Sequence, residues 1–338
     1  MRKRLNFGVK VGAALCLLAC AGGTAFGQDE GELTAKRRLF PGVGPGLRTV
    51  KRGADGRVYV LASPAPGLVV FDAAGRQVLS IGAPVPEAAG KTVGTPITFG
   101  EDCDVDAEGR IYVADRGANR ILIFSKDGAL LRSITAPSPV SIAAMPEGEV
   151  GVATLREPHL VVVFDKNGRD VREFGDPEAI AERAELNRFL NIGKLATDDQ
   201  GHLYYAFEYF PEPTVRQYDR FGYSQLEIRY TAIEALTTAR AARREIDRQE
   251  RRGDTPTFKR VLTAMGVDRA SGEVWIALQN TLLHFDKDGN RRANYQLYTP
   301  QGARLEAGTI LVEKERLIIG SDPLGVYEFE RPTLRVKE

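Results

Sequence analysis

Short apolar runs alternate with glycine turns along most of this 338-residue chain. Six times, a glycine turn precedes a strand that starts with an aliphatic residue, and a short loop leads to a second strand that closes on an aromatic. The copies span residues 58–75, 112–128, 150–168, 203–222, 274–289 and a degenerate 317–331. Such self-similarity predicts an array of like supersecondary units that bury their faces on one another.

The apolar positions of each copy predict strands that are buried on both faces. The closing aromatics are Phe71, Phe124, Phe164, Tyr218, Phe285 and Phe329. Three residues before each stands an aliphatic residue: Leu68, Ile121, Val161, Val215, Leu282 and Val326. Because side chains alternate along a strand, an offset of three places the two positions on opposite faces. Burial of both faces is typical of a blade packed between two neighbours.

Each copy also has an earlier strand before its opening glycine and a later strand after its second glycine. Six units of four short antiparallel strands predict an all-β fold, a closed six-bladed β-propeller. Residues 33–40 look strand-like, whereas the sixth copy ends soon after Phe329. We therefore expect the N-terminal strand to complete the last blade and close the ring, which removes a sheet edge.

The second copy, YVADRGANRILIFSKDG at residues 112–128, resembles the NHL repeat. Blades of that family typically read tyrosine-valine-alanine-aspartate, a turn with asparagine, arginine-isoleucine, and then an aromatic and a glycine turn. The family's three polar residues correspond here to Asp115, Asn119 and Arg120 alone, because other residues stand in these places in the other copies. The resemblance implies a six-bladed propeller of the exported bacterial type.

All long insertions fall on one face of the predicted ring. The first-to-second and third-to-fourth strand turns of every blade share one face, here called the glycine-turn face. The opposite insertion face carries the second-to-third strand loops and the connections between blades. An irregular segment at 83–96 and helices at about 176–190 and 231–253 are expected there.

Capping patterns predict where the two helices begin. Asp176 as N-cap before Pro177 starts the first, and Thr231 with Glu234 forms a capping box for the second. The second helix should end at Gly253. Its apolar stripe should lie on the ring: Ile233, Leu236, Ala239, Ala242 and Ile246. The opposite side should be exposed to solvent: Arg243, Arg244, Asp247, Arg248 and Arg251. It is either a solvated face with ion pairs, such as Arg243 with Asp247, or a patch that docks a partner.

Residues 1–27 read as a signal peptide, with a basic start, an apolar core and small residues before the cleavage site. The apolar core is too short for a transmembrane segment. We therefore expect a secreted or periplasmic protein with a single mature propeller, residues 28–338. The stretch that ends at Cys20 also resembles a lipoprotein box, so anchoring through an acylated Cys20 is the alternative.

Cysteine and charge content narrow the function classes. Two of the three cysteines lie in the signal, which leaves Cys103 and excludes an internal disulfide. Cys103 lies on a predicted inner strand, where a buried, inert thiol is favoured over a reactive one. Loss of the four basic residues of the signal lowers the net charge from +1 to −3. Nothing in this balance indicates a nucleic-acid partner.

The three histidines do not form a zinc set. His202 stands at a solvent position, His284 at a blade-packing position, and His159 alone lies on the insertion face. Three aspartates precede glycine turns at nearly constant offset, which predicts that they accept backbone N–H bonds there. These are Asp106, Asp198 and Asp268.

Catalytic propellers of the lactonase type hold a divalent cation through carboxylate and asparagine side chains at the starts of inner strands. The nearest matches here are Glu101 and Asp102 at the start of the second blade, and Asn191 at the start of the fourth. Oxygen ligands of this kind suit calcium. No further ligands match in the fifth and sixth blades, so loop carboxylates without a ligand are the competing interpretation.

The fourth-blade loop at 207–213 is rich in aromatic residues, which either pack beneath the helices or contact a ligand directly. Together with polar residues on equivalent loops, it outlines the central mouth of the insertion face. The candidate ligand-binding residues are Arg116, Arg156, His159, Glu208, Tyr209, Phe210, Gln279, Asn280 and Asp322.

These features favour an exported, non-catalytic propeller that binds a protein, peptide or glycan on the insertion face without a cofactor. The alternative is a lactonase-like hydrolase or lyase with a calcium ion at the channel mouth. The fold does not choose between them, because propellers host many functions.

Overall fold

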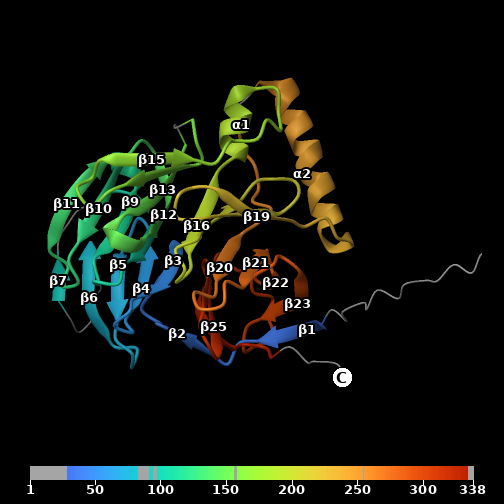
Figure 1. Cartoon of the computed structure of the whole chain (residues 1–338). Helices are drawn as coiled ribbons and strands as arrows, with labels where there is room; N and C mark the ends of the chain where they lie inside the picture. The colour runs from blue at the N-terminus through green and yellow to red at the C-terminus, as the bar shows by residue number, and fades with distance from the viewer. Residues whose placement is uncertain (1–28, 83–90, 94–96, 156–157, 254, 334–338) are drawn as a thin grey trace, which may run out of the picture.

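The computed structural model describes residues 29–82, 91–93, 97–155, 158–253 and 255–333. They form six sheets, each built on four antiparallel strands and arranged in a ring (Figure 1). The innermost strands of neighbouring blades contact one another around the axis. The predicted six-bladed β-propeller is thus confirmed.

Blades 1 to 3 contain no α-helix among their described residues. Blade 1 contains β3 (Leu47–Arg52), β4 (Val58–Ala62), β5 (Gly67–Phe71), β6 (Gln77–Gly82) and a short parallel strand, β7 (Lys91–Val93). Blade 2 contains β8 (Gly100–Val105), β9 (Ile111–Asp115), β10 (Arg120–Phe124) and β11 (Leu130–Thr135). Blade 3 contains β12 (Pro139–Ala144), β13 (Val150–Thr154), β14 (Val161–Phe164) and β15 (Asp170–Phe174). The rest of the insertion expected at 83–96 lies outside the described residues.

Blades 4 to 6 carry the helices and the ring closure. Blade 4 contains β16 (Gly193–Thr197), β17 (Leu203–Phe207), β18 (Thr214–Tyr218) and β19 (Ser224–Arg229). Blade 5 contains β20 (Ala264–Val267), β21 (Val274–Leu278), β22 (Thr281–Phe285) and β23 (Arg291–Tyr298). Blade 6 contains β24 (Thr309–Val312), β25 (Arg316–Ser321) and β26 (Gly325–Glu330).

The second strand of most blades is buried on both faces, as the sequence pattern predicts. All residues of β4, β9, β17 and β21 are buried. Burying one large apolar side chain stabilises the fold by roughly 1.5–3 kcal/mol. The repeated apolar pattern therefore builds the blade-to-blade core.

The aspartates before the glycine turns accept backbone N–H bonds, which confirms that prediction. Asp106 accepts the N–H of Arg110 at 2.8 Å and the hydroxyl of Tyr112 at 2.9 Å. Asp198 repeats the arrangement with His202 and Tyr204, both at 2.9 Å. These carboxylates tie each glycine turn to the ring of its own second strand.

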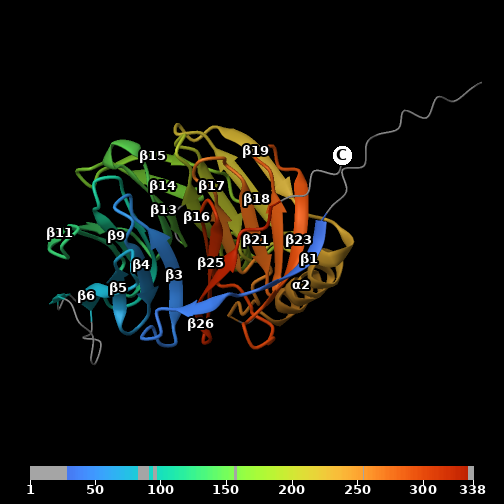
Figure 2. The ribbon, with the colours of Figure 1, turned by 90° about the horizontal axis from the view of Figure 1, so that it is seen from below.

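The N-terminal segment closes the ring. β2 (Arg37–Leu39) pairs antiparallel with β26 and completes blade 6, as predicted. β1 (Asp29–Thr34) was not predicted, and it pairs in parallel with β23 of blade 5. Figures 1 and 2 both show this segment running beside the last two blades. One segment thus covers the outer edges of two blades.

Helix α1 (Ala184–Leu190) is shorter than the predicted helix, and the expected N-cap at Asp176 is wrong. The Asn187 side-chain oxygen accepts the N–H groups of Ile180 at 2.9 Å and Ala181 at 2.8 Å. Because a side chain takes these donors, the residues before α1 fold back on it as a loop.

Helix α2 (Ile233–Arg252) has Ala232 as its N-cap without a side-chain hydrogen bond, so the capping box predicted at Thr231 is wrong. It ends at Gly253 in the left-handed conformation, as predicted. Within the described part of the chain, no helix has the length and apolar character needed to cross a membrane.

One side of α2 faces the ring, although the stripe differs from the predicted one. Ala235, Ala239 and Ile246 are buried, whereas Leu236 is 37% exposed. Arg243 pairs with Glu212 at 2.6 Å on the fourth-blade loop, which ties the helix to the ring. The basic residues expected on the solvent side are exposed.

Candidate functional site

The candidate site is the insertion-face mouth of the central channel, where the innermost strands begin. Side chains from one blade satisfy the exposed strand edge of the next. Asp102 and Asp104 accept the N–H groups of Ile142 at 3.3 Å and Ala144 at 2.9 Å. Ser141 donates its hydroxyl hydrogen to Asp102 and accepts the N–H of Leu195 at 2.9 Å. These bonds supply partners for backbone groups that face the channel.

Two arginines and a phenylalanine form one side of the mouth around Glu101. Nε of Arg116 lies 2.8 Å from one carboxylate oxygen of Glu101. Nη1 of Arg48 lies 3.7 Å from the other carboxylate oxygen. Both guanidinium groups also lie over the ring of Phe99, at 4.9 Å for Arg48 and 5.3 Å for Arg116. Stacking on the ring and pairing with the carboxylate hold both cations in place.

The strand starts explain why Arg48 and Glu101 reach this mouth. In β3 and in β8, the register with the second strand shifts by one residue across these two positions. A residue inserted in this way is a β-bulge, which re-aims a side chain out of the regular alternation. The two bulges occupy equivalent positions in neighbouring blades, so they bring opposite charges together.

Asp115 fixes the loop that carries Phe99. Its fully buried carboxylate accepts the N–H groups of Thr98 at 3.0 Å and Phe99 at 2.8 Å, and it pairs with Arg120 at 2.9 Å. At Gly117, a Cβ atom would meet Phe99 and Thr98 at 2.9 Å. A glycine is therefore required for this close approach.

Glu208 and Arg260 form the other side of the mouth. A buried carboxylate oxygen of Glu208 lies 3.0 Å from Nε of Arg260. The Glu208 backbone oxygen accepts the N–H of Val261 at 2.8 Å, which fixes the chain that returns from α2. Burial raises the pKa of Glu208, and the charges of Lys194 and Arg260 oppose this shift.

The two sides share one electrostatic environment. The negative charge of Glu101 raises the pKa of Glu208 and also that of Arg260. Cations form the outer layer: the side chains of Arg48, Arg116 and Arg260 are 28%, 39% and 40% exposed. Their carboxylate partners lie beneath, with Glu101 and Glu208 8% and 3% exposed. The mouth therefore presents positive hydrogen-bond donors to solvent.

The predicted ligand-binding aromatics have packing partners instead of open surface. Phe210 is 3% exposed and stacks on Phe207 with ring centroids 3.9 Å apart. Tyr209 packs against Phe189 of α1 at 4.7 Å. Of the two alternatives for this loop, the structure therefore shows packing beneath the helices.

The other predicted ligand residues spread over the insertion face. Arg116 and Glu208 lie at the mouth. His159 lies 3.9 Å from Glu173 at the end of β15, the outer strand of blade 3. Asp322 accepts the N–H of Gly46 at 2.8 Å. Gln279 is exposed in the two-residue turn after β21, and its neighbour Asn280 donates to Gln296 at 2.8 Å. Arg156 lies outside the described residues.

The predicted metal ligands do not converge. Glu101 pairs with arginines and Asp102 bonds Ser141, while the Asn191 side chain accepts the N–H of Glu178 at 2.9 Å and donates to its carbonyl at 2.8 Å. Among the residues that the structure describes, no group of three or more His, Cys, Asp or Glu side chains could hold a metal. The three predicted ligands therefore do not form one site.

Sequence reasoning missed Arg48, Lys194 and Arg260. Arg48 and Lys194 begin inner strands, as Glu101 does, so an alignment of all strand starts could have found them. No sequence signal marks Arg260, because it reaches the mouth only through the return path of the chain from α2. Cys103 is buried, as expected, and burial raises the pKa of its thiol.

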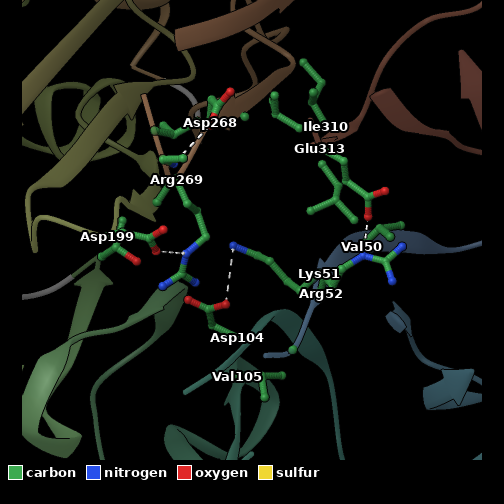
Figure 3. Close-up of a pocket in the computed structure, with 18 of the residues that line it drawn as sticks. Val50, Lys51, Arg52, Asp104, Val105, Asp199, Asp268, Arg269, Ile310 and Glu313 are labelled. Carbon is green, nitrogen blue, oxygen red and sulfur yellow. Dashed lines mark hydrogen bonds and ion pairs between the residues drawn. The ribbon is translucent and has the colours of Figure 1, made fainter. Parts of the chain in front are cut away.

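Figure 3 shows residues that line a pocket at the opposite end of the channel, on the glycine-turn face. There the ends of the inner strands enclose a cavity of about 650 Å³. A cavity of only about 30 Å³ lies nearer the insertion face, beside Arg48 and Lys194. The two mouths therefore differ, with one crowded by charged side chains and the other hollow.

No protein-family model and no curated protein matches the chain. Among solved structures, it is similar to a streptogramin B lyase, with a TM-score of 0.53 and 14% identity over 86% of this chain and 84% of that one. It is also similar to a catalytically inactive virginiamycin B lyase from Staphylococcus aureus with quinupristin, with a TM-score of 0.53 and 13% identity over 87% and 83% of the two chains. The selenomethionine-substituted form of that lyase has a TM-score of 0.51, with 13% identity over 88% of both chains. At this identity, the likeness shows the propeller fold alone.

Proposed function

We propose that this protein is an exported, non-catalytic propeller of NHL type whose insertion-face mouth binds an acidic segment of a partner protein or peptide. The layered charge of the mouth carries the proposal. Guanidinium groups form the outer layer, and their carboxylate partners lie beneath them. An arriving ligand would meet the cations first.

The donor chemistry suits carboxylates. A guanidinium offers planar pairs of N–H donors that match a carboxylate, and such charge-assisted bonds are stronger than neutral ones. Arg116 uses Nε for Glu101 at 2.8 Å. No bond to protein is assigned within the described structure to its Nη atoms, which can therefore serve a ligand.

Contacts within the protein position the donors of the mouth before any ligand binds. Phe99 supports two guanidinium groups, and Asp115 fixes the backbone of Phe99. Fewer side-chain rotamers are lost on binding when donors are already held in place, so more of the interaction energy is available for affinity. Positive potential at the mouth would also speed the approach of an acidic partner.

The balance of charge agrees with an anionic ligand. Four cations, Arg48, Arg116, Lys194 and Arg260, stand against Glu101, Asp102 and Glu208. The signal-like residues 1–27 support the exported part of the proposal.

Binding of immobilised peptides tests the proposal. An aspartate-rich peptide should bind wild-type protein more tightly than the same peptide with asparagines, and binding should weaken with salt. Arg116→Glu should weaken binding of the aspartate-rich peptide at least ten-fold. The matched control is Arg76→Glu, a charge reversal on an 81% exposed side chain of the glycine-turn face, and it should change nothing.

Two results would contradict the proposal. Equal binding of the aspartate and asparagine peptides would remove the role of charge. Equal losses in the Arg116→Glu and Arg76→Glu variants would remove the role of this face. Selective binding of a uronic-acid oligosaccharide over every acidic peptide would replace the protein partner with an anionic glycan.

A further inference from the structure

The cavity on the glycine-turn face has the size of a small-molecule pocket. Its volume of about 650 Å³ falls within the range of roughly 300–1,000 Å³ typical of ligand sites. The ends of the inner strands of blades 1, 2, 4, 5 and 6 line it. Three of the residues that line it have partly exposed apolar side chains: Ala196, Met265 and Leu311.

Lys51 places an ammonium group in this cavity. Its Nζ lies 4.0 Å from Asp104 Oδ1, which is beyond hydrogen-bond distance. No hydrogen bond of this ammonium is found among the described residues, and its side chain is 20% exposed. Burial by itself would lower the pKa of Lys51, but the charges of Asp104 and Asp102 raise it above its usual value. The group is therefore a cation at every physiological pH.

Arg269 supplies a second cation that is held in position. Its Nε pairs with Asp199 Oδ1 at 3.0 Å, and its backbone oxygen accepts the Asp199 N–H at 2.8 Å. Figure 3 shows the Lys51 and Arg269 side chains pointing toward one another in the cavity. The positive charge of Arg269 opposes the rise in the Lys51 pKa, which reports repulsion between the two. A negative group between them would relieve that repulsion.

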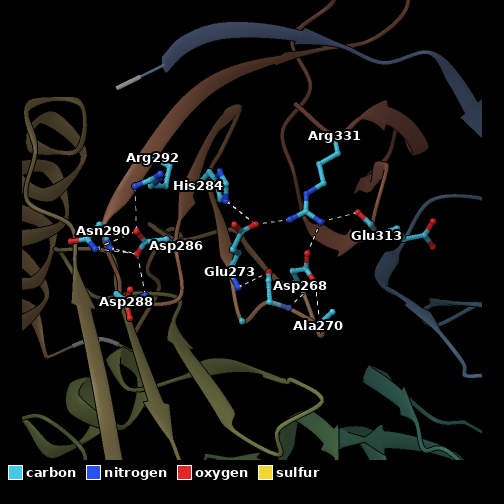
Figure 4. Close-up of polar contacts among 12 residues, drawn as sticks. Asp268, Ala270, Glu273, His284, Asp286, Asp288, Asn290, Arg292, Glu313 and Arg331 are labelled. Carbon is cyan, nitrogen blue, oxygen red and sulfur yellow. Dashed lines mark hydrogen bonds and ion pairs between the residues drawn. The ribbon is translucent and has the colours of Figure 1, made fainter. Parts of the chain in front are cut away.

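Two other arginines of the wall are already engaged. Arg331 binds Asp268 and Glu273, each at 2.5 Å, and donates to the Glu313 carbonyl at 3.1 Å (Figure 4). Arg52 pairs with the Glu313 carboxylate and with a backbone oxygen. The Nη groups of Arg269 have no such partner within the part of the chain that is described. Among the arginines of the wall, Arg269 therefore has available donors, and Lys51 adds its ammonium group; Lys314 lies at the rim.

The carboxylates of the wall favour a monoanion over a dianion at this position. Asp104 and Asp199 already offset the two cations, so a dianion such as phosphate would meet two carboxylates at close range. A monocarboxylate can accept bonds from the guanidinium and the ammonium, while an apolar body lies along the partly exposed side chains of Ala196, Met265 and Leu311.

We propose that this cavity binds a small aliphatic monocarboxylate, with its carboxylate between Lys51 and Arg269 and its chain against the apolar wall. This site lies at the opposite end of the channel from the acidic-segment site proposed above and goes beyond that function. The two can be tested separately, because they share no residue.

Calorimetric titration with aliphatic carboxylates of four to eight carbons tests the inference, with primary amides of the same length and inorganic phosphate as comparison probes. A carboxylate should bind at least ten-fold more tightly than its amide and more tightly than phosphate. Lys51→Met and Arg269→Gln should each weaken binding at least ten-fold. Lys314→Met, which removes a cation from the rim of the same cavity, should leave affinity within two-fold.

Several results would overturn the inference. These are absence of binding by any carboxylate, equal binding of amide and carboxylate, tighter binding of phosphate, or an equal loss in the rim variant. Thermal unfolding accompanies each titration. If Lys51→Met fails to fold, Lys51→Arg and Arg269→Gln carry the test, since the first keeps the charge and should bind whereas the second should not.

Discussion

Replacing Asp115 with alanine should destabilise blade 2 and loosen the insertion-face mouth together. The carboxylate is fully buried and makes three bonds, to the N–H groups of Thr98 and Phe99 and to the guanidinium of Arg120. Without it, two backbone donors lose their acceptor and Arg120 loses its ion pair. The ring of Phe99, which supports two arginines of the mouth, also loses its anchor.

The size of the effect follows from these three bonds. A hydrogen bond to a charged group contributes about 1.5–3 kcal/mol, and removing one partner of a buried ion pair costs about 3–5 kcal/mol. Arg120 is 29% exposed, so water can replace part of its lost partner. We expect Asp115→Ala to lower the free energy of unfolding by about 3–4 kcal/mol. Asp115→Asn keeps an oxygen for the two N–H groups, and we expect about half that loss.

Chemical denaturation followed by circular dichroism measures both variants. Asp288→Ala is the control, since this carboxylate is 66% exposed in a glycine turn, and its effect should stay within about 0.5 kcal/mol. Affinity for the aspartate-rich peptide should fall in Asp115→Ala and stay unchanged in the control. A loss below about 1 kcal/mol for Asp115→Ala, or equal losses for alanine and asparagine, would refute the reasoning from buried hydrogen bonds.

Three further predictions concern packing and pH. Gly193→Ala would place a Cβ atom 2.2 Å from the ring of Tyr205. The free energy of unfolding should therefore fall by about 1–3 kcal/mol, and the melting temperature with it. An unchanged melting temperature would contradict this. Burial raises the pKa of Tyr59 to about 12 from 10.0. The neutral form therefore contributes stability that is fully present below pH 10 and is lost as pH rises through 12. Tyr59→Phe should lack this loss, and parallel pH–stability curves for the variant and the wild type would contradict the prediction. Ile246→Ala removes a 6% exposed side chain of α2 that packs against Leu190 of α1. It should lower the free energy of unfolding by about 2 kcal/mol or more and speed proteolysis of α2. The same change at the exposed Leu236 should do neither.

The repeat pattern was sufficient to predict the fold because burial in a blade is periodic and local. An aliphatic residue and an aromatic at an odd offset recur in every copy, and each position is buried for the same reason. The strand-like residues before the first blade and the missing strand after Phe329 likewise predicted the closure by β2. The extra strand β1 carried no such signal, since it pairs at the edge of a blade that is already complete.

The helix boundaries depended on contacts that sequence patterns do not reveal. Asp176 and Pro177 form a sound N-terminal pattern, yet the Asn187 side chain takes two N–H groups ahead of α1. The aromatic loop of blade 4 had two interpretations in sequence. Packing of Phe210 and Tyr209 beneath α1 decided between them, because only the folded chain shows what lies above that loop.

The sequence by itself determined the architecture of this protein, because each blade repeats the same alternation of buried positions and the same turn chemistry. Tertiary structure alone decided where charge gathers and where the channel is hollow. Arg48, Glu101 and Arg260 are far apart in sequence, and they meet because β-bulges and the return from α2 aim them at one mouth. Lys51 and Arg269 point toward one another at the other mouth because ring closure brings distant blades to one axis.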